Sequence, residues 1–257
     1  MSGVEGLVPR LRAAGCVFAE EEAALLVEAA VGEQVLERLV ARRVAGEPLE
    51  LVLGWVEFAG LRLAVAPGVF VPRRRTELLA REVVRLLAGR VSPVLVELCC
   101  GVAPVAAAVA AALPVLEIHA SDVDPAAVAC ARLNLPTTAQ VTVGDLDSSL
   151  PERLLGHVDV LAANAPYVPT AGIARMPREA REHEPAAALD GGPDGLGVAR
   201  RVVAAAPRWL RPGGHVVVET STAQAPLLLE AMAEAGLSGV VRRWPERDAT
   251  AVVGTAP

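Results

Sequence analysis

From Val94 onwards, short apolar runs alternate with longer helical patterns, and this rhythm constrains the fold more than any other feature of the chain. A short, continuous apolar run is typical of a strand that is buried on both faces. Strands that alternate with helices along a chain form a parallel sheet with helices on its two sides. The sequence therefore predicts an α/β domain with strands at 94–98, 115–120, 140–143, 158–163, 215–219, 239–243 and 250–254, and with helices at 102–113, 125–133, 196–210 and 223–235.

The residues before this domain follow a different pattern. From Val4 to Ala45, apolar residues recur at spacings of three and four, which predicts a small helical unit. Two strand-like runs follow at 49–58 and 61–65, and they predict a hairpin. The chain is therefore expected to comprise a helical N-terminal domain (1–48), a β-hairpin linker (49–72) and an α/β domain (73–257).

The charge of the chain limits its partners. The formal net charge is −6, and all 24 basic residues are Arg. A protein that binds nucleic acid over a broad face needs a positive surface field, so we expect no direct nucleic-acid partner. A local basic groove is compatible with this charge.

The chain also shows no sign of a membrane segment or a metal site. It has no run of about 18 uninterrupted apolar residues, and its N-terminus lacks the basic and apolar parts of a signal peptide, so we expect a cytoplasmic protein. The cysteines and histidines lack the spacing of metal ligands, and reduced thiols are the default expectation. These residues are Cys16, Cys99, Cys100 and Cys130, and His119, His157, His183 and His215.

The strand predicted at 158–163 ends abruptly in a polar turn. Asn164, Ala165, Pro166 and Tyr167 follow it, and Tyr167 is the only tyrosine of the chain. Open α/β sheets bind their ligands beyond the carboxyl ends of the strands, so this turn is a candidate site. Asn and Pro are also ordinary turn residues, and a surface turn is the alternative.

Two acidic residues follow other strands of the predicted sheet. Asp122 lies 21 residues after Gly101, close to the offset at which an acidic residue accepts hydrogen bonds from ribose hydroxyls. Asp145 ends the third strand and is a candidate partner for an adenine amino group. A solvated loop residue at 122 and an ordinary turn residue at 145 are the alternatives.

Six segments of the chain together form a recognisable pattern, namely AGEPLELVLGWVEFAGLRL, PGVFVPRRRTELL, VLVELCCG, ASDVDPAAVACARLN, NAPYVP and EHEPAAALDGGPDGL. In this order they resemble the protein glutamine N-methyltransferases, which act on peptide-chain release factors or a ribosomal protein. The resemblance covers about residues 40 to 257. Its most specific part is the combination of the Asn164–Tyr167 turn with Glu184-Pro185 and the 189–196 block.

The resemblance implies a fold and a mechanism. The fold is that of the class I S-adenosylmethionine-dependent methyltransferases, a Rossmann-like domain with a seven-stranded, mostly parallel sheet. The family motif is Asn-Pro-Pro-Tyr, so Asn164, Ala165, Pro166 and Tyr167 are the implied catalytic residues. The Asn164 side-chain oxygen and the Ala165 carbonyl would accept both hydrogens of a substrate amide, and the Tyr167 ring would pack beside the amide plane.

The resemblance also implies a cofactor, S-adenosylmethionine, which is released as S-adenosylhomocysteine. The family has three glycines in the loop after the first strand, and this chain retains only Gly101. Arg73, Thr76, Glu77 and Glu184 are implied to bind the substrate, although Thr76 is also a plausible helix cap and the Arg triplet a solvated helix entrance. The implied cofactor-binding residues are Glu97, Cys99, Gly101, Asp122, Val123, Asp145, Leu146 and Asn164.

We therefore expect an enzyme that methylates a side-chain amide, namely a glutamine of a peptide-chain release factor or ribosomal protein. Two alternatives remain open. One is a methyltransferase of a small metabolite, and the other is a catalytically inactive, methyltransferase-fold binding protein, which the altered glycine loop suggests. The sequence leaves the oligomeric state open, with a monomer as the default.

Overall fold

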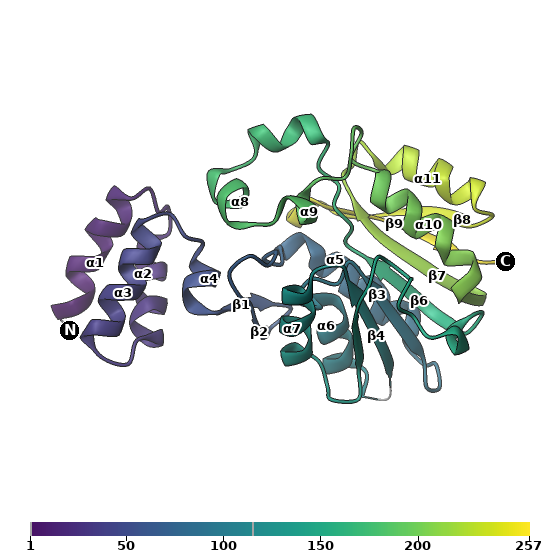
Figure 1. The fold of residues 1–257 in the computed structure, drawn as a ribbon, viewed down its shortest axis with the longest axis horizontal. Helices are drawn as coiled ribbons and strands as arrows, with labels where there is room; N and C mark the ends of the chain where they lie inside the picture. The colour runs from purple at the N-terminus through teal and green to yellow at the C-terminus, as the bar shows by residue number, and fades with distance from the viewer. Residues whose placement is uncertain (1, 115) are drawn as a thin grey trace.

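The computed structural model describes residues 2–114 and 116–257 and shows an elongated molecule (Figure 1). Three helices, α1 (Ser2–Ala13), α2 (Ala19–Ala29) and α3 (Glu33–Val44), form a small bundle at one end. Their buried side chains make a core of their own, separate from that of the sheet, with Leu11, Ala23, Leu26 and Val40 fully buried. The predicted helical unit is thus present, while the proposed division into three domains stays a prediction.

The hairpin is shorter than the sequence pattern predicted. Residues Leu49–Leu53 form a helix, α4, whereas we expected a strand to begin at Leu49. Gly54 adopts a left-handed conformation (φ 79°) and ends this helix, which is the common use of glycine after a last turn. The strands β1 (Trp55–Phe58) and β2 (Leu61–Ala64) then pair in antiparallel fashion. The prediction was wrong at 49–53 because a short apolar run suits a buried helix as well as a strand.

The α/β domain contains one sheet of seven strands within the described residues, which confirms the predicted fold class. The strand order is β5-β4-β3-β6-β7-β9-β8. The strands are parallel from β5 to β7, and β9 is antiparallel to both of its neighbours. The bounds are β3 Val94–Leu98, β4 Glu117–Asp122, β5 Gln140–Val143, β6 Val158–Ala163, β7 Leu210–Thr220, β8 Ser238–Trp244 and β9 Ala249–Thr255.

Helices cover both faces of this sheet (Figure 1). In β6 every residue is buried, and successive side chains alternate between two cores: Val160 and Ala162 face one core, Leu161 and Ala163 the other. This double burial explains the continuous apolar runs of the sequence. Val115, where one strand was predicted to begin, lies outside the described residues. The covering helices are α5 (Glu77–Leu87), α6 (Pro104–Ala112) and α7 (Pro125–Asn134) on one side, and α10 (Gly197–Trp209) and α11 (Ala225–Glu234) on the other.

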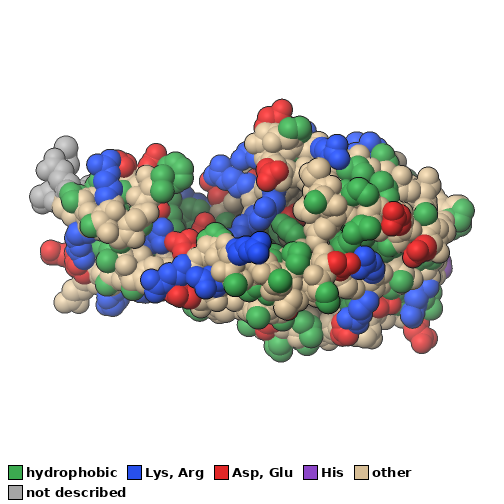
Figure 2. Space-filling view, turned by 90° about the horizontal axis from the view of Figure 1, so that it is seen from above, with side chains coloured by type: hydrophobic (Ala, Val, Ile, Leu, Met, Phe, Trp, Pro, Cys, Tyr) green, Lys and Arg blue, Asp and Glu red, His purple; other side chains and the backbone are tan. Residues whose placement is uncertain are grey.

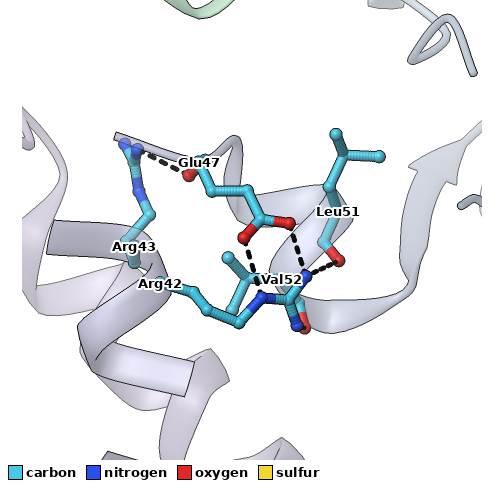
Figure 3. A network of polar contacts seen from close by, with 5 residues as sticks. All are labelled: Arg42, Arg43, Glu47, Leu51 and Val52. Carbon is cyan, nitrogen blue, oxygen red and sulfur yellow. Dashed lines mark hydrogen bonds and ion pairs between the residues drawn. The ribbon is translucent and has the colours of Figure 1, made fainter. Parts of the chain in front are cut away.

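A polar network joins the end of α3 to α4 (Figure 3). The Arg42 guanidinium donates to the Glu47 carboxylate (Nε to Oε2, 2.7 Å) and to the carbonyl oxygens of Leu51 (3.0 Å) and Val52 (3.3 Å). Because one side chain satisfies two carbonyls at the end of a short helix, it fixes α4 against the helical bundle. Arg43 donates to the Glu47 carbonyl oxygen at 3.1 Å.

Arg43 also ties the bundle to the α/β domain. Its guanidinium donates to Glu22 of α2 (Nε to Oε2, 2.6 Å) and to Glu179 (2.7 Å). Glu179 belongs to α8 (Arg178–His183), which precedes the short helix α9 (Ala186–Leu189). Between the bundle and the α/β domain the surface is hollowed, and basic side chains gather beside the hollow (Figure 2). Within the described residues, no helix is long and apolar enough to cross a membrane.

Candidate active site

A cavity opens at the carboxyl ends of the parallel strands, beside the point where the strand order reverses between β3 and β6. Ligands bind at such a switch point in open α/β sheets. The cavity volume is about 620 Å³, which is in the range of sites for small molecules. Among its lining residues are twelve of the predicted site residues: Arg73, Glu97, Cys99, Gly101, Asp122, Val123, Asp145, Leu146, Asn164, Ala165, Pro166 and Tyr167.

The loop between β3 and α6 forms one wall, and its backbone has an unusual alternation. Cys99, Gly101 and Ala103 all have positive φ angles, of 51°, 54° and 58°. These are the three positions at which the related family has glycine. A side chain makes this conformation costly by about 1–2 kcal/mol, so the loop keeps a glycine-type shape although two glycines are replaced. A Cβ atom added at Gly101 would meet nothing within 4 Å, so the space beside this backbone is open.

Glu97 fixes the far end of this loop. Its carboxylate accepts hydrogen bonds from the backbone N–H groups of Val105 (3.3 Å) and Ala106 (2.7 Å) in the first turn of α6. The side chain is buried, and burial raises the pKa of Glu97 to about 8, even though the two backbone bonds act in the opposite direction. Glu97 therefore anchors α6 to the end of β3, which sets the position of the loop.

Asp122 fixes the middle of the loop from the end of β4. One carboxylate oxygen accepts from the N–H of Gly101 (2.8 Å), and the other accepts from the N–H of Asp124 (2.9 Å). Burial raises the pKa of Asp122. An ionised carboxylate offers about four acceptor positions, so this side chain retains capacity for a ligand in the cavity.

Asp145 lies in a different environment from the one expected. It is exposed, and its carboxylate is paired with Arg201 of α10 at 2.8 Å. Arg201 itself lines the cavity. A ligand that approaches Asp145 would therefore meet a carboxylate that is already paired. The next residue, Leu146, contributes a buried apolar side chain to the cavity.

The Asn164–Tyr167 turn, which follows the neighbouring strand β6, also lines the cavity. Asn164 donates from Nδ2 to Oγ1 of Thr76 (3.2 Å). The Tyr167 hydroxyl donates to Oε1 of Glu219 (3.3 Å), and the guanidinium of Arg75 lies 5.8 Å from the centre of the Tyr167 ring. Burial raises the pKa of Tyr167. Tyr167 is therefore a neutral aromatic wall of the cavity.

The 189–196 block holds this turn in place, which gives a physical reason why the two motifs occur together. A Cβ atom at Gly191 would lie 2.6 Å from the carbonyl oxygen of Pro166, and one at Gly195 would collide with the carbonyl oxygen of Tyr167. Gln224 of the segment before α11 donates from Nε2 to the same Tyr167 oxygen at 2.9 Å. The backbone of the block thus packs directly against the backbone of the turn.

The four residues predicted to bind substrate occupy different positions. Arg73 lines the cavity and donates to the buried Glu184 at 2.6 Å. Thr76 is completely buried and contacts Asn164. Glu77 does not line the cavity; it accepts from the N–H of Ala59 at 3.3 Å. The roles of these four residues in substrate binding stay predictions.

Sequence reasoning missed Glu219, Arg75 and Arg201. Glu219 follows the apolar residues of β7 in the same way as Asp122 ends β4, so an acidic residue at the end of a buried strand was a usable signal. Arg75 and Arg201 belong to a basic triplet and an amphipathic helix, where nothing distinguishes them from solvated charges.

Several known proteins are similar to this chain. Residues 60–182 match the family model of the methyltransferase small domain. A release factor glutamine methyltransferase of Geobacter sulfurreducens is 39% identical over 201 residues, which are 77% of this chain and 69% of that protein. A protein of the same name from Mycolicibacterium smegmatis is 41% identical over 206 residues, which are 78% of this chain and 71% of that protein.

Two further similarities concern substrate and fold. A 4-amino-L-phenylalanine/4-methylamino-L-phenylalanine methyltransferase of Streptomyces pristinaespiralis is 36% identical over 191 residues, which are 72% of this chain and 65% of that protein. The solved structure of a methyltransferase from Pyrococcus furiosus superposes with a TM-score of 0.55 at 17% identity, and the match covers 76% of this chain and 89% of that one. The latter similarity shows the class I methyltransferase fold.

Proposed function

Because the chain belongs to the release factor glutamine methyltransferase family, as its motifs suggested, we propose that it methylates the side-chain amide of a glutamine in a peptide-chain release factor. The methyl donor is S-adenosylmethionine. The observation that carries this proposal is that the Asn164 turn and the Asp122 carboxylate line one cavity. The wall at Asp122 can thus hold a donor while the wall at Asn164 holds an acceptor.

The residues present fit S-adenosylmethionine. Asp122 has acceptor capacity for ribose hydroxyls, the open space beside Gly101 admits close approach to the loop backbone, and Leu146 offers an apolar contact for the base. When bound, this cofactor supplies a methyl group on a positively charged sulfur. The carboxylate of Asp145 would have to exchange its bond with Arg201 to meet an adenine amino group.

The acceptor wall suits a neutral amide. Asn164 Oδ1 and the carbonyl of Ala165 accept the two N–H hydrogens, which polarises the N–H bonds and aims the nitrogen into the cavity. Tyr167 packs beside the amide plane and excludes water. No general base of matched pKa is needed, because the proton can leave after the transfer.

A second acceptor is favoured by one specific observation. The relative from Streptomyces pristinaespiralis is named for aromatic amino acids that carry an amino group on the ring. An aromatic amine also presents two N–H hydrogens, so the same two acceptors can bind it. A small aromatic amine is therefore the competing substrate class.

We assign the contact with the protein substrate to the N-terminal domain, residues 1–48. The Arg43–Glu179 ion pair joins the helical bundle to α8, and Met176 and Pro185, which line the cavity, flank this helix in the sequence. A protein that inserts a glutamine into the cavity would lie in the hollow between the bundle and the α/β domain (Figure 2). Binding energy from this remote surface would help to orient the amide.

Two measurements test the proposal. Calorimetric titration should show binding of S-adenosylmethionine, and a radiolabelled methyl group should then appear on a release factor but not on 4-amino-L-phenylalanine. Asn164→Ala should lose transfer, whereas Arg178→Ala, which changes an exposed side chain, should behave like the wild type. Absence of cofactor binding at millimolar concentration, or labelling of the small amine alone, would contradict the proposal.

A further inference from the structure

The residues between the Asn164 turn and the 189–196 block leave the sheet and form an excursion beside the cavity. This 169–189 segment contains a 3₁₀ helix, η3 (Thr170–Arg175), and the short helices α8 and α9, and it lies on the side of the α/β domain that faces the bundle (Figure 1). It contributes an apolar part of the cavity lining, namely Met176, Pro185, Ala187, Ala188 and Leu189. The position of this segment therefore sets the shape of the cavity.

Apolar packing does little to hold this segment in place. None of its side chains belongs to the three apolar cores of the described residues. Between residues 169 and 188, only Ala180 and Glu184 are buried. A segment with few buried apolar contacts opens at a low cost in free energy, so its polar contacts decide how firmly it is held.

Hydrogen bonds close the base of the excursion. The N–H of Val168 donates to the carbonyl of Leu189 at 3.1 Å, and the N–H of Thr170 donates to the carbonyl of Gly192 at 2.9 Å. The Thr170 hydroxyl also donates to the carboxylate of Asp190 at 2.7 Å. These bonds bring the two ends of the segment together, and the middle, which contains α8, depends on other contacts.

Two ion pairs hold the middle of the segment. The buried carboxylate of Glu184 accepts from Arg73 at 2.6 Å, which joins the segment to the residues before α5. The carboxylate of Glu179 in α8 accepts from Arg43 of α3 at 2.7 Å. Arg73 lines the cavity, whereas Arg43 belongs to the bundle and does not. Through Arg43 the bundle thus reaches a segment that lines the cavity.

Arg43 is itself held firmly by the bundle and the residues that follow it. Its side chain is only 10% exposed, and its guanidinium donates to Glu22 of α2 at 2.6 Å and to the carbonyl of Glu47 at 3.1 Å (Figure 3 shows the latter bond). Both bonds remain when the Glu179 carboxylate is removed, so the bundle does not depend on Glu179. Arg43 is therefore a fixed donor to which α8 is attached.

We propose that Arg43 and Glu179 are positioning residues, through which the helical bundle holds the 169–189 segment in place beside the cavity. The pair acts on the acceptor wall, because the segment is hydrogen-bonded to Val168, the residue after the Asn164–Tyr167 turn. A segment held in this way keeps its apolar side chains in the lining and excludes water from the place of transfer. This inference rests on the proposed function where it concerns the acceptor. It gives the bundle a second role, since the bundle then shapes the cavity as well as contacting the protein substrate.

The test compares Glu179→Ala with Glu182→Ala, which removes a carboxylate from the same helix, where it pairs with Arg178. Trypsin cleavage after Arg175 measures how often the segment opens, because Arg175 is exposed, precedes Met176 of the cavity lining, and adjoins neither substitution. Glu179→Ala should be cleaved there about 3- to 10-fold faster than the wild type, because a charge-assisted hydrogen bond to a half-exposed carboxylate is lost. Glu182→Ala should stay within about twofold of the wild-type rate.

Methyl transfer gives a second measurement. In Glu179→Ala, kcat/KM for the release factor should fall about 3- to 10-fold, while the Kd of S-adenosylmethionine, measured by titration, should change less than about twofold. Glu179→Gln, whose amide oxygen can still accept from Arg43, should recover most of both losses.

Wild-type cleavage or wild-type transfer in Glu179→Ala would overturn the inference, and so would equally fast cleavage of Glu182→Ala. Lower transfer without faster cleavage would also overturn it, because Glu179 would then act by direct contact with the substrate. An inactive wild-type enzyme would instead overturn the proposed function. The cleavage rates do not depend on activity, so the two failures are distinguishable.

Discussion

The raised pKa of Glu97 predicts how the stability of this protein depends on pH. Burial raises the pKa of this carboxyl from 4.5 to about 8, so the folded state holds the proton more tightly than the unfolded state. Between these two values the unfolded chain binds fewer protons, and the free energy of unfolding must fall as the pH rises. The stabilisation is fully present below about pH 4.5 and is lost as the pH rises through about 8. Glu97→Gln removes this titration.

The magnitude follows from the separation of the two pKa values. At about 1.36 kcal/mol per pH unit, the full effect is about 5 kcal/mol, of which about 2 kcal/mol falls between pH 6 and pH 8. Urea unfolding of the wild type and of Glu97→Gln should be measured at several pH values in this range. Because Glu97 is only 2% exposed, solvent screening reduces the effect little.

The difference between the two proteins is the diagnostic quantity, since other carboxyl groups titrate in both. Val105 and Ala106 donate to different oxygens of Glu97, so the single oxygen of a glutamine can accept from only one of them while its NH₂ group faces the other N–H, and a constant offset of about 1–3 kcal/mol is expected. The wild type should lose about 2 kcal/mol relative to the variant between pH 6 and pH 8. A difference that stays constant with pH would show that Glu97 is ionised in the folded protein and would refute the reasoning.

Two further predictions concern the backbone of the site. Cys99→Gly should stabilise the protein by roughly 0.5–1 kcal/mol, because relief of the left-handed strain at this residue outweighs the conformational entropy that glycine loses on folding. Cys100→Gly, at a buried position without positive φ, should cost about 1–3 kcal/mol. Urea unfolding measures both variants, and equal effects would contradict the strain argument. Gly191→Ala should lower the free energy of unfolding by at least about 2 kcal/mol and should lower methyl transfer, because the added Cβ would lie 2.6 Å from the Pro166 carbonyl oxygen. In the control Gly172→Ala the nearest atom to the added Cβ is 3.4 Å away, so the free energy of unfolding should change by less than about 0.5 kcal/mol. Unimpaired transfer by Gly191→Ala would show that the turn does not depend on this packing.

The architecture of the α/β domain could be predicted from the sequence because its strands are buried on both faces. A run such as 158–163 has no polar alternation, and the structure places all six residues of β6 in the interior. The same reasoning, which assigns a short apolar run to a strand, failed at 49–53. This run forms a short helix whose buried residues Leu51 and Val52 give a similarly apolar sequence. Hydrophobicity indicates burial, and only the length of the apolar run and the turns beside it distinguish a strand from a short helix.

Some residues of the candidate site could be predicted from the sequence, and others could not. Asp122 and Asn164 could be found because each ends a strand of a parallel sheet, and such ends meet at one edge. Thr76 and Asn164 could not be connected from the sequence, since 88 positions separate them and their hydrogen bond depends on how the segment before α5 packs beside the end of β6. Such a contact is a property of this packing, and no spacing along the sequence encodes it.

The altered loop after β3 shows why a changed motif need not mean a changed site. Cys99 and Ala103 stand where related enzymes have glycine, yet the backbone has positive φ at both positions. Neighbouring groups hold this shape: Asp122 binds the N–H of Gly101, and the N–H of Cys100 donates to the carbonyl of Ser121 at 3.1 Å. These bonds come from β4, so the rest of the sheet imposes the conformation and the loop bears the strain. The replaced glycines should therefore lower stability while they leave the loop shape in place, and the loop by itself is no argument for an inactive protein.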